Sequence, residues 1–569
     1  MTRQDTKRTA IVSSRVTFIV GVLSFFLLLS PTAAAPPRLD PSGISGSLVL
    51  CGGSKLPDRI RDRFFALAGG ENAKIIVIPT ANDKAENDES ETYLDYWTAR
   101  KPKSLVLLHT RKRDLANAKA FLAPLKEATG IWFDGGSQAR IADAYLGTAA
   151  EKEFYAVLKR GGVIGGTSAG AAIMSRVMIT NGNPTAELGV GFDLLPEAVV
   201  DQHFLARNRK SRLLGVLAKH PDRVGYGIDE GTALVVRGRF MEVLGDSTVT
   251  VILPASKSRS QREIVLKEKD RADLTSLRRA VRNRNAADDP PAMPPTPVVS
   301  QGSLVIVGGG GMSEAITKKF IELAGGRKSL IVVLPTAVPD LLARRAKVPS
   351  FLTRAGAQNV KVMPHNRPEE VESKEFLEAL SKAGGIWFGG GRQWRFVDAY
   401  VDTKAYDALH GVLRRGGVIG GSSAGASIQG SFLARGDPRG NREIMAEGYE
   451  KGFGFLPGVA IDQHFAQRKR FPDMTRLVNR YPQLLGIGID EATALVVKGH
   501  IAQVMGRSAV HFYDRRKPVV KGQPDYETAK PGQSFDFKTR KISGQPTPPP
   551  VKPKTPPKKK TPAKKQTVQ

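Results

Sequence analysis

Two serines in this chain stand in the same five-residue pattern, with small residues on both sides. The strings GTSAG around Ser168 and GSSAG around Ser423 both fit G-x-S-x-G. Each string follows a short apolar run that predicts a strand and precedes small residues that permit a helix. A sharp strand-to-helix turn exposes the serine Oγ, and the helix N-terminus behind it favours developing negative charge. The pattern therefore predicts nucleophilic attack by a serine hydroxyl on a carbonyl carbon.

Each serine is followed by a histidine in the string DQHF, at His203 and His464. The chain has 8 histidines, so a paired occurrence is informative. A neutral imidazole can take the serine proton and return it to the leaving group. We therefore predict two nucleophile–base pairs, Ser168 with His203 and Ser423 with His464. An α/β-hydrolase usually has far more chain between these residues, which makes that fold the weaker candidate.

These patterns belong to an internal repeat that covers most of the chain. GIWFDGGSQAR recurs as GIWFGGGRQWR, and GYGIDEGTALVV recurs as GIGIDEATALVV. We place the two copies at residues 45–254 and 301–514. The other segments are interpreted as a signal peptide (1–35), a charged and proline-rich linker (255–300) in which 273–284 could form a short basic helix, a C-terminal extension (515–545) and a disordered Lys/Pro-rich tail (546–569).

Within each copy, short apolar runs alternate with helical patterns. The runs at 75–78, 131–133 and 163–164 predict buried strands. Residues 57–67 carry apolar side chains at helical spacing, and Ser313 is placed to cap the matching helix of the second copy. This alternation predicts an α/β fold in which each copy has a mostly parallel sheet flanked by helices. Functional side chains should then gather at the carboxyl ends of the strands.

Four strings together carry a family resemblance over both copies. The chain resembles the cyanophycinase and dipeptidase E family of serine peptidases in the strings GG-[TS]-S-A-G-A, DQHF and GIDE-x-TALVV, and in a Gly-Gly-x-Gln turn upstream of them. The resemblance implies two tandem class I glutamine-amidotransferase-like domains, with serine in place of the usual cysteine nucleophile. It also implies a peptide substrate cleaved at aspartyl residues, either β-Asp-Arg units of cyanophycin or amino-terminal Asp dipeptides.

The resemblance also implies roles for individual residues. The nucleophiles and bases are the serines and histidines named above. The oxyanion hole would use Gly135, Gly136 and the amide of Ala169 in the first copy, and Gly390, Gly391 and Ala424 in the second. Substrate contacts are implied for Gln138, Asp201, Gln202, Arg207, Arg209 and Arg212, and for Gln393, Asp462, Gln463, Arg468 and Arg470. Arginine forks suit aspartyl carboxylates, although these arginines could equally form a solvated helix face.

The resemblance further implies a third catalytic member between serine and histidine, an acid that orients the imidazole. The second copy has extra residues in this segment and offers Asp437. The first copy offers Glu187 as its nearest acid, with Asn183 near the expected position. We therefore expect the second copy to be the better-supported enzyme. The recurring Asp-Glu pairs at 229–230 and 490–491 are interpreted as structural turns without chemistry.

The first 35 residues have the pattern of an export signal. A basic start precedes an apolar run at 16–29, and a small-residue cleavage site ends at Ala35. We expect cleavage after Ala35 and export to the periplasm, cell surface or exterior, with an uncleaved anchor as the alternative.

The formal net charge is +30, which by itself could suggest nucleic acid. Much of the excess lies in disposable places such as the lysine-rich tail at 546–569, and no nucleic-acid-binding module accompanies it. We expect the tail to contact an anionic envelope surface or only to aid solubility, with no specific nucleic-acid partner.

The sequence predicts no metal and no cofactor. It has no Cys/His cluster of metal-ligand spacing, and its Gly-rich turns at 52–53 and 308–311 lack the pattern of a phosphate loop. The single cysteine, Cys51, ends an apolar run and is interpreted as a core residue. The rival to an exported peptidase is a catalytically impaired relative that binds acidic or Asp-Arg peptides at the envelope.

Overall fold

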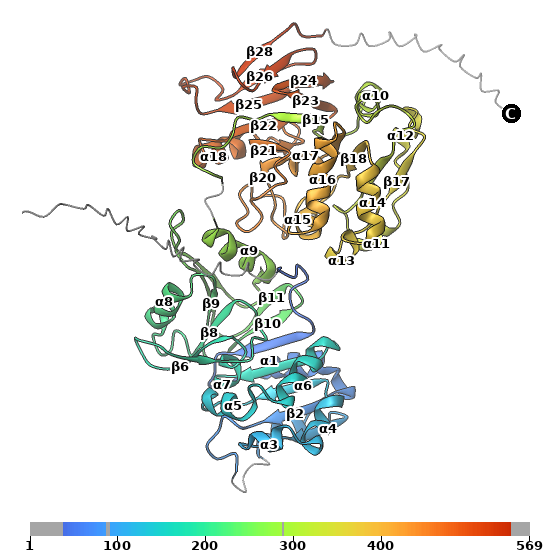
Figure 1. Cartoon of the computed structure of the whole chain (residues 1–569). Coiled ribbons are helices and arrows are strands. Elements are labelled where there is room, and N and C mark those ends of the chain that lie inside the picture. Colours follow the sequence, from blue (N-terminus) through green and yellow to red (C-terminus); the bar gives the residue numbers. More distant parts are fainter. Residues whose placement is uncertain (1–37, 87–91, 287–289, 548–569) are drawn as a thin grey trace, which may run out of the picture. The chain divides into compact units, whose positions relative to one another are not determined.

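The computed structural model describes residues 38–86, 92–286 and 290–547, which form two α/β repeats (Figure 1). The expected signal peptide at 1–35 and nearly all of the tail at 546–569 lie outside these described residues. Among the described residues, no helix is both long and apolar enough to cross a membrane.

The first repeat is built on a sheet of eight strands in the order β14-β11-β10-β1-β5-β4-β2-β3. Its strands are β1 (Ser47–Cys51), β2 (Lys74–Ile78), β3 (Ser104–Leu107), β4 (Gly130–Phe133), β5 (Val163–Thr167), β10 (Thr232–Arg237), β11 (Phe240–Gly245) and β14 (Arg271–Asp273). The half from β1 to β3 is parallel, whereas β10, β11 and β14 add antiparallel strands beyond β1. The carboxyl ends of β1, β4 and β5 therefore meet at one edge.

A smaller sheet in the same repeat has the order β13-β12-β9-β8. Its strands are β8 (Ala198–Gln202), β9 (Val224–Ile228), β12 (Val249–Leu253) and β13 (Arg262–Leu266), and a separate hairpin is formed by β6 (Val177–Asn181) and β7 (Glu187–Val190). The chain passes directly from β9 in this sheet to β10 in the large sheet. The turn between them therefore joins the two sheets.

Helices cover both faces of the large sheet, and the last two helices of the repeat pack against the small sheet instead. The helices of the repeat are α1 (Asp58–Ala68), η1 (Gly70–Asn72), α2 (Asp95–Thr98), α3 (Arg113–Ala116), α4 (Lys119–Glu127), α5 (Gln138–Tyr145), α6 (Ala149–Lys159), α7 (Ala169–Ala172), α8 (Lys210–Lys219) and α9 (Leu274–Asn285). Leu48 and Leu50 of β1 join the core that includes α6, while Val49 and Cys51 join the core beneath α1. This alternation follows from the two-residue period of a strand, and it buries Cys51 as expected.

The second repeat has a nine-stranded sheet in the order β17-β16-β18-β19-β15-β23-β24-β27-β28. Its strands are β15 (Val299–Val307), β16 (Ile331–Leu334), β17 (Val360–Val362), β18 (Gly385–Phe388), β19 (Val418–Ser422), β23 (Thr493–Gly499), β24 (Ile501–Gly506), β27 (Ser534–Asp536) and β28 (Lys541–Ser543). A second sheet holds β20 (Gly430–Phe432), β21 (Leu456–Gln463), β22 (Leu485–Ile489), β25 (Val510–Asp514) and β26 (Glu527–Ala529). The strand orders repeat those of the first copy, with β28 and β20 as additional edge strands.

The helices of the second repeat follow the same plan. They are α10 (Glu314–Leu323), α11 (Asp340–Arg344), α12 (Ser350–Arg354), α13 (Pro368–Val371), α14 (Lys374–Lys382), α15 (Trp394–Tyr400), α16 (Lys404–Arg414), α17 (Ala424–Ser427) and α18 (Phe471–Arg480). Ser313 caps α10 as predicted, because its side chain accepts a hydrogen bond from the Ile316 amide. The predicted helix at 57–67 is α1. The expected α/β class is confirmed, with parallel strands forming one half of each large sheet.

The segment at 255–300 is not only a tether, as its charge and prolines had suggested. It contributes β13 and β14 to the two sheets of the first repeat, and α9 packs Leu274 and Val281 into that repeat's core. Asp273 caps α9 by accepting from the Ser276 amide at 2.8 Å. The extension at 515–545 likewise supplies β26, β27 and β28 to the second repeat. Pairing with distant strands, rather than local composition, incorporates both segments.

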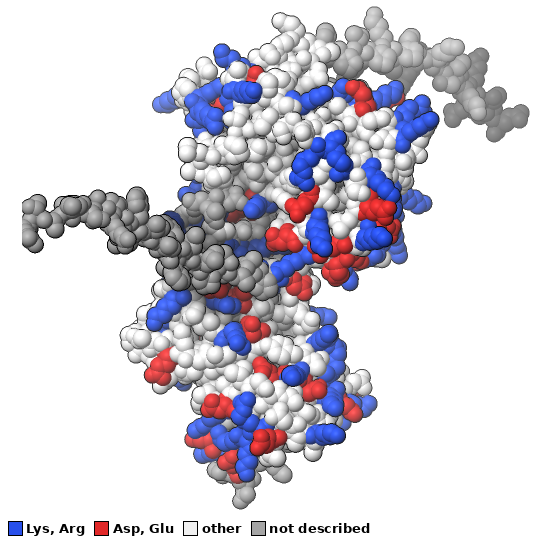
Figure 2. Space-filling view, in the orientation of Figure 1, with Lys and Arg blue, Asp and Glu red and all other residues white. Residues whose placement is uncertain are grey.

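One face of the molecule shows how its surface charges are distributed. On the face in Figure 2, basic and acidic side chains are interspersed over the described surface. Several of the basic residues are paired, such as Lys74 with Glu127 at 2.6 Å and Lys361 with Glu375 at 2.9 Å.

We expect Leu274→Ala to lower the free energy of unfolding of the first repeat by about 2–5 kcal/mol, because Leu274 is fully buried in that core. Asn283→Ala, on the same helix, should change it by less than about 0.5 kcal/mol. Urea unfolding of the two variants checks this. Equal, negligible effects would mean that the segment is a tether after all.

Candidate active site

The two serines lie on strained turns at the carboxyl edge of the large sheets. Ser168 follows β5 with φ 51° and ψ −109°, and Ser423 follows β19 with φ 57° and ψ −113°. A residue other than glycine with such a φ is strained by about 1–3 kcal/mol and is held there by its surroundings. A Cβ placed on Gly166 would lie 2.5 Å from the carbonyl oxygen of Gly170, so the glycines of the pattern permit the turn.

Each serine hydroxyl is hydrogen-bonded to the predicted histidine. His203 Nε2 lies 2.9 Å from Ser168 Oγ, and His464 Nε2 lies 3.0 Å from Ser423 Oγ. The partners are 35 residues apart in the first repeat and 41 in the second, yet the geometry is the same. Both predicted nucleophile–base pairs are therefore assembled, and the extra residues of the second copy do not disturb them.

The acid that orients each histidine is a glutamate from the turn joining the two sheets. His203 Nδ1 lies 2.6 Å from Glu230 Oε1, and His464 Nδ1 lies 2.5 Å from Glu491 Oε1. A carboxylate at Nδ1 holds the imidazole in the tautomer whose Nε2 can accept the serine proton. Each repeat thus contains a complete Ser–His–Glu triad.

The predicted acids Glu187 and Asp437 are wrong. Glu187 is exposed at the start of β7, where it pairs with Asn181 across the hairpin. Asp437 forms an ion pair with Arg439 at 3.1 Å and is not among the partners of His464. With an acid in place in both repeats, the reason for preferring the second copy disappears.

The Asp-Glu pairs that sequence reasoning had treated as structural turns have divided roles. Asp229 Oδ1 accepts from the amides of Leu205 and Ala206, just after His203, and its Oδ2 accepts from Ser247 Oγ. In the second repeat Asp490 accepts from the amide of Ala466 and from Ser508 Oγ. The aspartate fixes the loop beside the histidine, and the neighbouring glutamate reaches the imidazole. The recurrence of the Asp-Glu pair in both copies was the sequence signal that could have identified the catalytic glutamate.

Three consecutive backbone carbonyls at the end of β1 bind the three catalytic segments. Cys51 O accepts from Ser168 N at 3.0 Å, Gly52 O from His203 N at 2.7 Å, and Gly53 O from Gly231 N, next to Glu230, at 3.1 Å. In the second repeat the carbonyls of residues 307–309 accept from Ser423, His464 and Ala492 at 3.0, 2.7 and 2.8 Å. The backbone of this turn therefore fixes the relative positions of the three catalytic segments.

That turn also makes room for the imidazole. A Cβ on Gly53, which has φ +106°, would lie 2.2 Å from His203 Cε1. A Cβ on Gly309, with φ +98°, would lie 2.3 Å from His464 Cε1. Only glycine at these positions lets the histidine reach its serine.

The predicted oxyanion turns lie against the nucleophiles. A Cβ on Gly135 would be 3.6 Å from Ser168 Cβ, and one on Gly390 would be 3.4 Å from Ser423 Cβ. Flanking amides fix the first turn, with Asp134 N bound to Ile78 O and Ser137 N to Ala81 O. Gly136 and Gly391 have φ +139° and +143°, and a side chain on either would meet a backbone carbonyl. The amides of Ala169 and Ala424, at the start of α7 and α17, complete the predicted set.

Burial lowers the pKa of both histidines below the ordinary value, and nearby Arg207 or Arg468 lowers it further. The hydrogen bond with the glutamate opposes this shift. The imidazoles are therefore neutral at neutral pH, as a general base must be.

Comparison with known proteins shows the family of this chain. The model of Peptidase family S51 matches residues 48–244 and 304–505, which is both repeats and more than half of the chain. This chain belongs to peptidase family S51. The tandem class I glutamine-amidotransferase-like fold expected from the resemblance is confirmed by these two matches together with the sheets described above.

Several S51 relatives are named. A cyanophycinase from Geminocystis herdmanii is 35% identical over 202 residues, covering 34% of this chain and 74% of the relative. A cyanophycinase from Trichormus variabilis is 32% identical over 229 residues, covering 38% of this chain and 76% of the relative. A peptidase from an acI-B1 Actinobacterium has a solved structure with 26% identity and a TM-score of 0.33, covering 42% of this chain and 97% of that one.

The glutamines expected to meet substrate in this S51 peptidase fall into two groups. Gln138 and Gln393 are buried and donate to backbone carbonyls of Ile179 and Ala434, so they brace the segment after the elbow. Gln202 and Gln463, beside the catalytic histidines, each have a buried amide oxygen without a partner in the described part of the chain. An unpaired buried acceptor is unfavourable, so these two fit donors on a bound peptide.

Most of the arginines expected to bind substrate instead form ion pairs or hydrogen bonds with residues beside the catalytic histidines. Arg212 is buried and forms a two-pronged ion pair with Asp201. Arg209 Nη1 donates to Gln202 O at 2.8 Å, and Arg470 Nη1 donates to Gln463 O at 2.7 Å. This leaves the exposed Arg207 and Arg468, which form no ion pair among the described residues.

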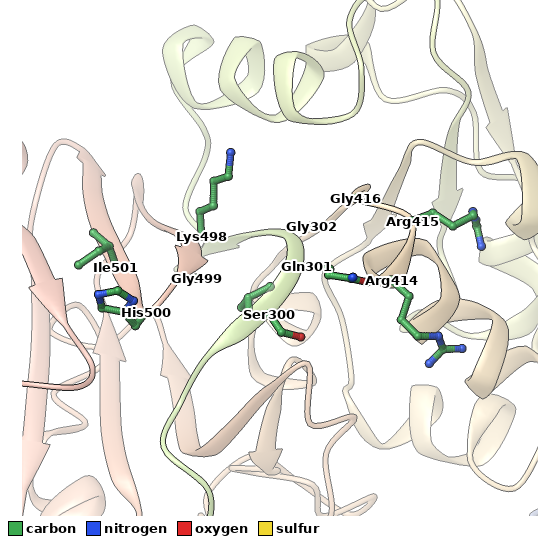
Figure 3. A pocket seen from close by; sticks show the side chains of 11 residues that line it. Ser300, Gln301, Gly302, Arg414, Arg415, Gly416, Lys498, Gly499, His500 and Ile501 are labelled. Carbon is green, nitrogen blue, oxygen red and sulfur yellow. The ribbon is translucent and has the colours of Figure 1, made fainter.

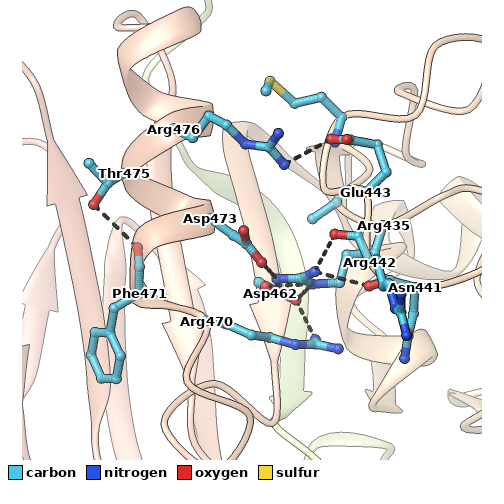
Figure 4. A network of polar contacts seen from close by, with 12 residues as sticks. Arg435, Asn441, Arg442, Glu443, Asp462, Arg470, Phe471, Asp473, Thr475 and Arg476 are labelled. Carbon is cyan, nitrogen blue, oxygen red and sulfur yellow. Dashed lines mark hydrogen bonds and ion pairs between the residues drawn. The ribbon is translucent and has the colours of Figure 1, made fainter.

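The second repeat supports its buried aspartate from a different segment (Figure 4). Asp473 stands where the first repeat has Arg212, so α18 has no arginine to offer there. Instead Arg435 Nε binds Asp462 at 3.0 Å, and its Nη2 binds Asp473 at 2.6 Å. The longer segment after the second elbow therefore supplies the guanidinium that α8 supplies in the first repeat.

One large hollow lies away from both triads. A cavity of about 620 Å³ is lined by residues 299–302, 414–416 and 498–501, at the amino end of β19 and thus opposite Ser423. Its basic side chains Arg414, Arg415 and Lys498 point away from one another in Figure 3. It is not part of the catalytic machinery.

We expect Glu230→Gln, tested with Ser423→Ala so that only the first triad works, to lower kcat/KM by about 10²–10⁴-fold. Glu491→Gln with Ser168→Ala should do the same. The acid limb of the pH profile, where protonation of the imidazole stops catalysis, should lie below pH ~6.5 and move lower when the glutamate is removed. Glu187→Gln and Asp437→Asn are the controls. A comparable loss in either control would restore the original assignment.

A charge swap tests the Arg435 network. Arg435→Met leaves Asp462 with one fewer cation and should destabilise the second repeat by about 3–5 kcal/mol. Adding Asp473→Arg rebuilds the arrangement of the first repeat and should recover most of that loss. Arg476→Gln, which removes only an exposed ion pair with Glu443, should cost about 0–1 kcal/mol. Urea unfolding measures all three, and no recovery in the double variant would refute the equivalence.

Proposed function

We propose that this S51 peptidase hydrolyses aspartyl peptide bonds, in β-Asp-Arg units like those of cyanophycin or in Asp-containing dipeptides. The observation that carries the proposal is the Ser–His–Glu array of hydrogen bonds in both repeats. The names of the relatives, cyanophycinases at 35% and 32% identity, support the substrate class.

The reaction follows from the positions of the groups. Ser168 Oγ or Ser423 Oγ attacks the carbonyl carbon while the imidazole Nε2 takes its proton. The glutamate stabilises the imidazolium, and the oxyanion turn with the Ala169 or Ala424 amide stabilises the charged oxygen. The imidazolium then protonates the leaving amine, and water releases the acyl group by the same steps in reverse.

Recognition of an aspartyl residue would use the groups that the framework leaves available. Arg207 and Arg468 are exposed near the imidazoles and can pair with a substrate carboxylate. The buried amide oxygens of Gln202 and Gln463 can accept from a substrate N–H. Both repeats present the same pair of groups, so we propose that both are active.

The alternative of an impaired binding protein rested on a missing acid, and Glu230 and Glu491 remove that reason. We further propose export directed by residues 1–35 and adhesion to an anionic envelope surface through the lysines of the tail at 546–569.

Four proteins test the proposal: the mature chain, Ser168→Ala, Ser423→Ala and the double variant. Each is assayed on β-Asp-Arg polymer and on Asp-Xaa dipeptides. We expect each single variant to retain turnover from its intact site, and the double variant to lose activity by about 10³-fold or more. If the mature chain and the double variant are equally inert on every substrate, the proposed substrate class is wrong.

A further inference from the structure

The two active sites share their triads but differ in the wall beside the oxyanion turn. In the first repeat a cavity of about 550 Å³ opens at Gly135 and Gly136. Asp83, Tyr93, Asp134 and Arg140 are among its lining residues. Since a Cβ on Gly135 would lie 3.6 Å from Ser168 Cβ, this cavity opens beside the nucleophile.

Asp134 is the distinctive group of this wall. It directly follows β4 and precedes the oxyanion turn, and its Oδ1 accepts from Trp132 Nε1 at 3.0 Å. Burial raises its pKa to about 6 against the opposing effects of the Trp132 hydrogen bond and the Arg61 charge. Because burial outweighs both stabilising contacts, a further cation bound beside this carboxylate would relieve part of the cost of its burial.

The second repeat carries different charges at the matching positions. Gly389 replaces Asp134 and Arg392 replaces Ser137, as GIWFGGGRQWR against GIWFDGGSQAR shows. Val338 and Pro339 replace Asn82 and Asp83. Arg392 lies there with its Nη2 bound to Asp437 O at 2.5 Å. The first wall therefore has carboxylates at 83 and 134 that the second lacks at the matching positions, and the second has an added arginine at 392. Arg140 and Arg395 are common to both, and Asp340 replaces Lys84.

A purely structural role for Asp134, as the acceptor for Trp132, does not account for the difference. Trp387 occupies the matching position of the second repeat and packs against Phe320 as Trp132 packs against Phe64. Its strand is followed by Gly389, so the core forms without this carboxylate.

We propose that the first site selects peptides carrying a cationic side chain, which pairs with Asp134, and that the second site selects neutral or acidic side chains. The inference rests on the proposed function and assigns different substrates to the two repeats. The chemistry is ordinary hydrolysis at both, in which the C–N bond breaks and water supplies the hydroxyl and the proton.

Matched substrates test the assignment. β-Asp-Arg and β-Asp-citrulline have nearly the same shape and differ by one charge, and β-Asp-Lys separates a guanidinium from an ammonium requirement. With Ser423→Ala, so that only the first site works, we expect kcat/KM for β-Asp-Arg to exceed that for β-Asp-citrulline by at least about tenfold. Asp134→Asn should abolish most of the preference, whereas Asp114→Asn, an exposed carboxylate on α3, should leave it intact.

A reciprocal variant in the second site tests for a gain of preference, which misfolding cannot produce. A Cβ on Gly389 would make only ordinary contacts, 3.5 Å from Leu334 O, so Gly389→Asp fits the second site. With Ser168→Ala, we expect this variant to gain preference for β-Asp-Arg over β-Asp-citrulline. Equal rates on the two peptides at the first site would overturn the inference while leaving the proposed function standing. Loss of turnover on all β-aspartyl peptides in both single-site proteins would instead refute the proposed function.

Discussion

Three neighbouring carbonyls at the end of one central strand hold each active site together. Residues 51–53 in the first repeat and 307–309 in the second accept hydrogen bonds from the backbones of the nucleophile, the base and the residue after the acid. Those three segments come from different parts of the chain and from two sheets. Because β1 and β15 are buried between parallel and antiparallel neighbours, they form a rigid reference for the triads. Strained φ values at the serine and the histidine persist because these bonds determine both backbones.

The buried aspartate beside each histidine shows how one electrostatic requirement can be met in two ways. Asp201 and Asp462 are fully buried, and a buried carboxylate must be paired. The first repeat supplies the cation from α8 and the second from the segment after its elbow. Asp473, at the position of Arg212, binds the same Arg435 guanidinium. The extra residues of the second copy thus serve the framework rather than the chemistry.

The two repeats are alike around the imidazole and differ in the wall beside the oxyanion turn. Groups that touch the imidazole are alike in type and distance in both copies. The wall beyond the oxyanion turn is free of that constraint and has diverged in charge at Asp134 and Gly389. The two repeats therefore share the catalytic geometry, whereas the wall beside the oxyanion turn differs between them.

The sequence by itself determined the features that depend on neighbouring residues. The elbows, the paired histidines, the internal repeat and the α/β rhythm all follow from local patterns of small, apolar and polar residues. Tertiary structure alone decided which acid reaches the imidazole, because Glu230 is brought to His203 by the crossing from the small sheet to the large one. It also decided which arginines are available, since burial of Arg212 and exposure of Arg207 depend on how α8 packs. Tertiary structure also incorporated β13, β14 and α9 into the first repeat. Strand pairing and burial join residues that are distant in sequence, and the composition of a segment does not show which partners it will have.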